Sequence, residues 1–180
     1  MLISAENSVL LIIDIQQRLA PAIHDVDALV QNNVWLARIA QKLGVPIIAT
    51  EQYPAGLGPT LPEVASCVPP TSIVEKIHFS AIPDHGLAAM PGFARDCVVL
   101  TGMETHVCVL QTALDLRALG KNVYVVAECV GSRRPEDRAL ALERMRQEGC
   151  RIVSREMVAF EWLRRAGTEA FRQISREFLR

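Results

Sequence analysis

The sequence predicts an α/β fold, a doubly wound and mostly parallel sheet of six strands with helices on both faces in three layers. Short apolar runs alternate along the chain with longer stretches whose apolar residues recur at helical spacing. The first run is uninterrupted, which is typical of a strand covered on both faces. Alternation of this kind produces right-handed crossovers between parallel strands. Because no repeat or linker interrupts the pattern, we expect residues 1–180 to form a single domain.

The first half of the chain supplies three predicted strands. Residues 8–13 form the first apolar run, which ends in the carboxylate of Asp14. A helical stripe covers residues 25–43, Gly44 ends it, and residues 45–49 predict the second strand. The other expected elements of this half are a Pro- and Gly-rich loop at 50–71 with one helical turn near 61–66, a short strand at 72–75 ending at Lys76, and a short helix from about Pro83.

The second half repeats the alternation of strand and helix. A strand at 97–100 turns at Gly102 into a helix that reaches Leu119 and carries Cys108 in its opening turn. The remaining expected elements are a strand at 122–127, a helix opened by Pro135 with an apolar stripe of Leu140, Leu142 and Met145, a strand at 151–154, and helical segments at 156–165 and 168–180.

Composition limits the kinds of partner. The formal net charge is -1, whereas nucleic acid and anionic membranes demand a basic surface, so we expect neither as a partner and expect a small-molecule substrate instead. The sequence shows no basic, apolar leader and no long apolar span, which predicts a soluble cytoplasmic protein. Five cysteines without a C-x-x-C motif indicate reduced thiols.

Polar residues gather where the predicted strands end. In doubly wound folds the ligand binds beyond the carboxyl ends of the strands, near the point where the strand order reverses. We therefore expect one crevice lined by Asp14, residues 50–52, Lys76, residues 102–108 and residues 128–132.

Three of these side chains suggest nucleophilic chemistry. Cys108 lies where backbone N–H groups and the helix dipole favour a thiolate, although a buried cysteine can also be a simple core residue. Asp14 can act as a general base and Lys76 can hold both groups, although the two can also form a structural ion pair. His106 is two residues from Cys108, so the two face different sides of a helix and a Cys–His dyad is disfavoured.

The chain resembles the isochorismatase-like cysteine hydrolases, a family with a Rossmann-like fold. The resemblance is carried by Leu11-Ile-Ile-Asp-Ile-Gln-Gln17, by Lys76 with Phe79-Ser80, and by Gly102-Met-Glu-Thr-His-Val-Cys-Val109. These motifs span most of the chain in the family's order. The stretches at 50–54 and 56–60 resemble the isochorismatase-domain-containing subgroup more narrowly.

The resemblance implies a set of roles. Cys108 is the expected nucleophile, Asp14 the proton acceptor and donor, and Lys76 the residue that supports both. A cis peptide is expected between Met103 and Glu104, with the N–H groups of Glu104 and Cys108 forming an oxyanion hole. The resemblance also suggests a homo-oligomer.

Departures from the family pattern bear on metal and substrate. Metal-using nicotinamidases carry an aspartate and a histidine where this chain has Glu51 and Tyr53, so we expect no catalytic metal and no cofactor. The expected substrate contacts are Gln16, Gln52, Tyr53 and Phe79, although Gln52 can equally serve to satisfy backbone groups.

Several functions remain open at this stage. The main hypothesis is a metal-independent cysteine hydrolase that cleaves a small amide or related C–N bond through a thioester. The alternatives are isochorismatase-type cleavage of a vinyl ether with Asp14 as the acid, a catalytically silent binding or scaffold protein, and a thiol sensor. The two arginines at 133–134 can meet an anionic substrate or form a solvated helix cap. Nucleotide-binding glycine motifs are lacking.

Overall fold

The computed structural model of the chain describes residues 2–179 and confirms the predicted fold class. One sheet has the strand order β3-β2-β1-β4-β5-β6, and its strand pairings are all parallel. The chain therefore begins in the middle of the sheet and winds outward in both directions. The strands are β1 (Ser8–Ile13), β2 (Ile47–Gln52), β3 (Ile73–Lys76), β4 (Cys97–Met103), β5 (Asn122–Gly131) and β6 (Arg151–Val153).

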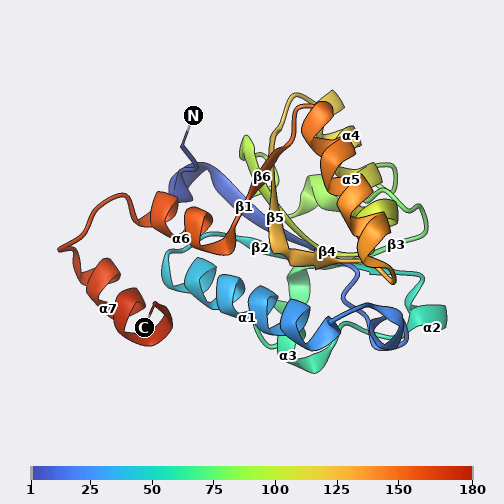
Figure 1. Cartoon of the computed structure of the whole chain (residues 1–180), viewed down its shortest axis with the longest axis horizontal. Helices are drawn as coiled ribbons and strands as arrows, with labels where there is room; N and C mark the ends of the chain where they lie inside the picture. Colours follow the sequence, from blue (N-terminus) through green and yellow to red (C-terminus); the bar gives the residue numbers. More distant parts are fainter. Residues whose placement is uncertain (1, 180) are drawn as a thin grey trace.

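Helices cover both faces of the sheet (Figure 1). The longer helices are α1 (Val26–Lys42), α4 (Leu110–Ala118), α5 (Pro135–Gln147), α6 (Arg155–Leu163) and α7 (Glu169–Phe178). The shorter ones are α2 (Pro54–Leu57), α3 (Pro62–Ala65), the π-helical turn η5 (Thr105–Val109), and the 3-10 turns η1 (Ala5–Asn7), η2 (Ala20–Ala22), η3 (Pro70–Ser72) and η4 (Gly86–Ala89).

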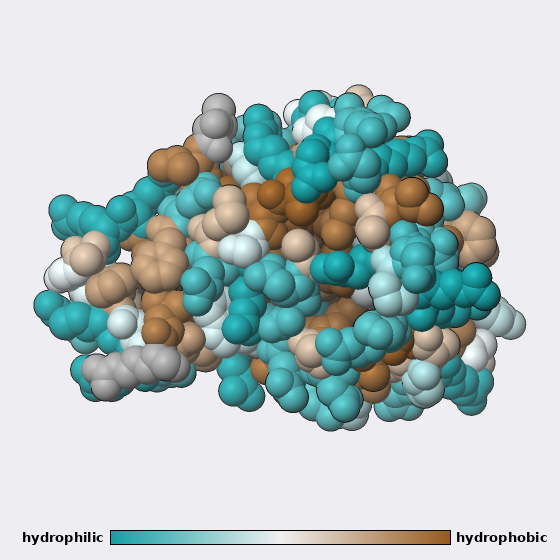
Figure 2. Space-filling view, in the orientation of Figure 1, coloured by the Kyte–Doolittle hydropathy of each residue, from teal (hydrophilic) through white to brown (hydrophobic). Residues whose placement is uncertain are grey.

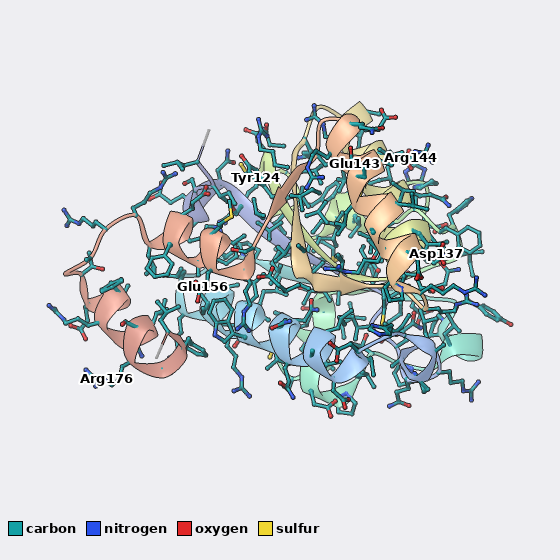
Figure 3. All side chains as sticks on the ribbon, in the orientation of Figure 1. Tyr124, Asp137, Glu143, Arg144, Glu156 and Arg176 are labelled. Atoms are coloured by element: carbon teal, nitrogen blue, oxygen red, sulfur yellow. The ribbon has the colours of Figure 1, made fainter. Side chains whose placement is uncertain are left out.

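Two hydrophobic cores follow from the alternation of side chains along the strands. Leu10 of β1 faces the core shared with α1 and α6, whereas its neighbour Leu11 faces the core shared with α4 and α5. Both side chains are fully buried. The outer helix surfaces are mostly hydrophilic (Figure 2), and Glu143 and Arg144 lie on the outer side of α5 (Figure 3). In the part of the chain described, no helix is both long and apolar enough to cross a membrane.

Three strands reach further than their apolar runs predicted. β2 continues through Glu51 and Gln52, β4 through Gly102 to Met103, and β5 to Gly131. Polar residues can be buried in these extensions because other parts of the chain satisfy their hydrogen bonds. The carboxylate of Glu51, for example, accepts hydrogen bonds from both the N–H and the hydroxyl of Thr60, each at 2.7 Å.

Two helical predictions need correction. The short helix expected from about Pro83 begins three residues later as the 3-10 turn η4, and Asp84 accepts hydrogen bonds from the N–H groups of Ile77 and His78 in the loop before it. On α5, Leu140 is 71% exposed, so the predicted apolar stripe is not a continuous contact. Met145 of the same helix is fully buried.

Candidate functional site

Asp14 stands directly after β1, at the centre of the sheet. Its side chain is fully buried, and its backbone adopts a left-handed conformation with φ of 49°, which aspartate tolerates better than most residues. Oδ1 accepts a hydrogen bond of 2.7 Å from the hydroxyl of Thr50, and Oδ2 lies 2.7 Å from Nζ of Lys76. Each carboxylate oxygen of Asp14 therefore has a partner, Thr50 for Oδ1 and Lys76 for Oδ2.

Lys76 ends β3 and reaches across β2 to Asp14. The two side chains are 1% and 0% exposed, so their charges interact without screening by water. An ammonium has three protons to donate, and this one is surrounded by acceptors from two strands and the following loop. Besides Asp14, the acceptors are Oε1 of Gln52 at 2.8 Å and the carbonyl oxygens of Phe79 at 3.0 Å and His78 at 3.2 Å.

Cys108 lies in the π-helical turn η5 and is 6% exposed. Its thiol lies near enough to the Asp14 carboxylate and the Lys76 ammonium for both charges to act on its pKa. Burial, and then the negative charge of Asp14, raise the pKa of the thiol to about 12, although Lys76 acts in the opposite direction. The prediction of a thiolate favoured by the helix terminus is therefore wrong. A thiol in this state needs an adjacent base before it can attack.

Gly102 allows the ends of β1 and β4 to approach each other. Its φ is 111°, and a Cβ atom at this position would lie 2.0 Å from the carbonyl oxygen of Ile13. Only glycine fits without displacing that backbone. Because Ile13 precedes Asp14, and Cys108 follows on the turn after β4, this close approach sets the carboxylate beside the thiol. The peptide bond between Met103 and Glu104 is cis.

Glu104 and Arg133 form a contact that sequence reasoning missed. Glu104 is 4% exposed, and its carboxylate accepts two hydrogen bonds from the Arg133 guanidinium, at 2.9 and 3.0 Å. Arg133 is thus paired with Glu104, although its side chain stays 63% exposed before α5. The only signal in the sequence was the single acidic residue inside the nucleophile motif.

The four expected substrate contacts differ in their surroundings. Gln16 is fully buried, and its amide bonds the backbone N–H and carbonyl of Gln52 and the carbonyl of Gly58, so its assignment as a substrate contact is corrected to a structural role. Gln52 uses its side chain on Lys76 and on the carbonyl of Ile77. Tyr53 and Phe79, 55% and 54% exposed, remain available on the surface near Lys76.

The end of β5 contacts both the surface and the segment that carries Cys108. Glu128 lies on the surface, where its carboxylate accepts a hydrogen bond from the N–H of Arg155. With Ser132 it lines a cavity of about 380 Å³ beside the start of α1, whose lining does not include Asp14, Lys76 or Cys108. Oγ of Ser132 also lies 3.0 Å from Nδ1 of His106, two residues before Cys108.

Glu51, near the end of β2, already has hydrogen-bond partners within the chain. Glu51 is 8% exposed, and Thr60 occupies its Oε1. Tyr53 follows it in a left-handed conformation. Residues 2–179 contain no cluster of three or more histidine, cysteine, aspartate or glutamate side chains that could hold a metal ion.

Comparison with known proteins places this geometry in a family. The sequence model of the Isochorismatase domain matches residues 8–157. Isochorismatase family protein 1B of Dictyostelium discoideum is 37% identical over 174 residues, which cover 94% of this chain and 84% of that protein. The MAR1 ribonuclease structure from Caenorhabditis elegans has a TM-score of 0.90 and 33% identity, covering 100% of this chain and 93% of that one. YcaC from Pseudomonas aeruginosa, solved with hexane-2,5-diol and covalent acrylamide, has a TM-score of 0.87 and 25% identity, covering 99% and 92% of the two chains.

Proposed function

The chain belongs to the isochorismatase family, and from this premise we propose that it is a metal-independent cysteine hydrolase of a small amide or related C–N bond. The observation that carries the proposal is the buried Asp14–Lys76 ion pair, 2.7 Å long, beside the protonated Cys108 thiol. A carboxylate next to a thiol of raised pKa supplies the base that the thiol needs. The covalent acrylamide of the Pseudomonas neighbour is consistent with a reactive nucleophile in this fold.

The proposed reaction has two halves. First, Asp14 takes the thiol proton, Sγ of Cys108 attacks the amide carbon, and the N–H groups of Glu104 and Cys108 receive the oxyanion. The tetrahedral intermediate collapses to a thioester, and the departing amine takes the proton from Asp14. Water then attacks the thioester with Asp14 as base, which releases the acid and restores the thiol. Lys76 holds Asp14 in place throughout.

Two other functions are separated from this one by a single substitution. In vinyl ether cleavage Asp14 would supply a proton and the thiol would be dispensable, and a silent family member would show no turnover at all. Intact-mass measurement of the protein incubated with a panel of small amides, including propionamide and benzamide, tests all three. We expect an acyl adduct on the wild type and none on Cys108→Ala, with at least a 1,000-fold loss of turnover. Turnover that survives Cys108→Ala would contradict the thioester.

We do not expect this chain to share the ribonuclease activity named for the Caenorhabditis elegans neighbour. With a formal net charge of -1, the chain lacks the basic excess that ribonucleic acid binding requires. An oligoribonucleotide added to the same panel provides the check, and we expect it to remain intact.

We further propose that residues 1–180 act as one domain and that the protein is a homo-oligomer. All six strands share one sheet, and Tyr53, Ile77 and Phe79 form an exposed apolar group of 54–66% exposure beside the site. Light scattering of the purified protein tests the assembly. The cytoplasmic location stays a prediction, tested by fractionation of the producing cells.

A further inference from the structure

Arg133 and Glu104 form a bidentate ion pair, in which two guanidinium nitrogens bond the two carboxylate oxygens like a fork. Nη2 of Arg133 lies 2.9 Å from Oε1 of Glu104, Nε lies 3.0 Å from Oε2, and the backbone N–H of Arg133 lies 3.3 Å from the same Oε2. Two parallel guanidinium bonds to one carboxylate fix orientation as well as distance. The pair therefore holds the Glu104 side chain in one direction.

The fork continues the pairing of β4 with β5 beyond the sheet. Met103 pairs with Gly131 in the last register position of these strands. One step later Glu104 is tied to Arg133, and His106 is bonded to Ser132 at 3.0 Å. Two consecutive residues after β5 thus hold two residues of the segment that leads to Cys108.

The position of Glu104 gives this contact a meaning for catalysis. Its backbone N–H is one of the two donors that the proposed function assigns to the oxyanion hole. The carboxylate of the same residue is bonded to Arg133 in the loop after β5. With the side chain held by Arg133, rotation of the peptide group that carries this N–H is restricted.

We propose that Arg133 is a positioning residue that fixes the Glu104 amide of the oxyanion hole through the Glu104 carboxylate. The inference rests on the proposed function, because it concerns the oxyanion of that reaction. Arg133 itself touches neither the thiol nor Asp14 in the described contacts. Its removal loosens the donor and leaves the nucleophile and its base unchanged.

The expected effect falls on one chemical step. A misplaced donor weakens stabilisation of the tetrahedral intermediate, and small displacements at a reacting centre lower rates by up to about 100-fold. Alkylation of the thiol by iodoacetamide forms an S–C bond with loss of iodide, passes the thiol proton to Asp14, and develops no oxyanion. Comparing these two reactions of Cys108 therefore distinguishes a change in the oxyanion hole from a change in the nucleophile.

The experiment uses butyraldehyde to probe the hole and iodoacetamide to probe the thiol. The aldehyde adds reversibly to Sγ, and the thiol proton passes to the aldehyde oxygen, giving a thiohemiacetal whose oxygen occupies the oxyanion position. We measure the butyraldehyde concentration that halves the alkylation rate of Cys108. Arg133→Gln is expected to need at least about ten-fold more aldehyde than the wild type, with an unprotected alkylation rate within about two-fold.

Arg134→Gln is the matched control. Arg134 is the exposed neighbour of Arg133, and among the described residues its side chain makes no hydrogen bond or ion pair. We expect wild-type protection in this variant and partial recovery in Arg133→Lys, which keeps the charge and loses the fork. Glu104→Gln should weaken protection as Arg133→Gln does, and the double variant should be no worse than either single one, because both act through one contact.

The outcomes are separable. Equal protection in the wild type and Arg133→Gln overturns the positioning role and leaves the thioester proposal standing. Absence of protection in the wild type overturns both. If an amide substrate shows a raised KM with unchanged kcat in Arg133→Gln, the residue binds substrate, and the positioning role is wrong. Thermal unfolding of each variant verifies that the fold is intact.

Discussion

Two ion pairs flank the segment from β4 to Cys108, and they differ in nearly every respect. Lys76–Asp14 comes from the β1–β3 side of the sheet, with side chains 1% and 0% exposed. Arg133–Glu104 comes from the β5 side, with the arginine side chain 63% and the glutamate side chain 6% exposed. The first is a single contact between buried charges beside a thiol, which suits proton transfer. The second is a two-bond fork open to water, which suits the fixing of a backbone.

The largest difference between the two pairs should appear in stability. Lys76→Met leaves the Asp14 charge buried and unpaired, which should lower the free energy of unfolding by about 3–5 kcal/mol. Arg133→Met should lower it by no more than about 1 kcal/mol, because water reaches Glu104 once the arginine is shortened. Urea unfolding of both variants measures the contrast. Similar losses of unfolding free energy in the two variants would contradict the predicted difference between the buried pair and the exposed pair.

Gly102→Ala tests whether the close approach of β1 and β4 sets the first pair beside the thiol. The added Cβ meets the Ile13 carbonyl at 2.0 Å in a left-handed backbone, so we expect a loss of about 1–3 kcal/mol together with loss of turnover. Gly120→Ala is the control, since its φ is also positive, at 80°, but no atom lies within 4 Å of the added Cβ. That variant should retain turnover, and equal turnover in both variants would contradict the role of Gly102.

Alkaline pH should lower the stability of the fold through two buried thiols, Cys129 on β5 and Cys108 beside the Asp14–Lys76 pair. Burial raises the pKa of the Cys129 thiol above its ordinary value of 9.0. Burial and the negative charge of Asp14 raise the pKa of the Cys108 thiol from 9.0 to about 12. Above about pH 9 the unfolded thiols lose their protons while the folded ones keep them, so the folded state becomes less stable as pH rises. Each thiol contributes up to about 1.4 kcal/mol per pH unit.

Unfolding in urea between pH 8 and 10.5 measures this slope. Cys129→Ala should flatten it by about the share of one thiol without changing turnover. A slope that is the same in the variant and the wild type would show that Cys129 does not keep its proton in the folded state.

The succession of strands along the chain and the polar residues that follow them could be predicted from the sequence, because apolar runs and glycine stops report directly on backbone structure. Asp14 and Lys76 follow such runs, and they meet in the structure. Side-chain direction could not be predicted. Gln16 is polar enough to contact a ligand, but its amide is hydrogen-bonded to backbone groups. The sequence spacing of Glu104 and Arg133 likewise does not show that their side chains form an ion pair.

The state of the thiol could not be predicted either. A helix start favours the charged form, but the degree of burial around Cys108 and the distance to Asp14 exist only in the folded chain. Burial outweighs the helix terminus here, as it does for most enclosed thiols. The reach of β2 into Glu51 and Gln52 was hidden for a similar reason, since Thr60 satisfies the buried carboxylate from a distant loop.

The central place of β1 in the sheet has a consequence for the newly made chain. Asp14 is synthesised early, yet Lys76 can reach it only after β2 and β3 have joined β1 on one side, and Cys108 only after β4 has joined on the other. A ribosome-bound or truncated chain that lacks β4 therefore has no Cys108 thiol beside Asp14 and Lys76. The three side chains come together only once β1 to β4 have joined in one sheet and the turn η5 has formed after β4.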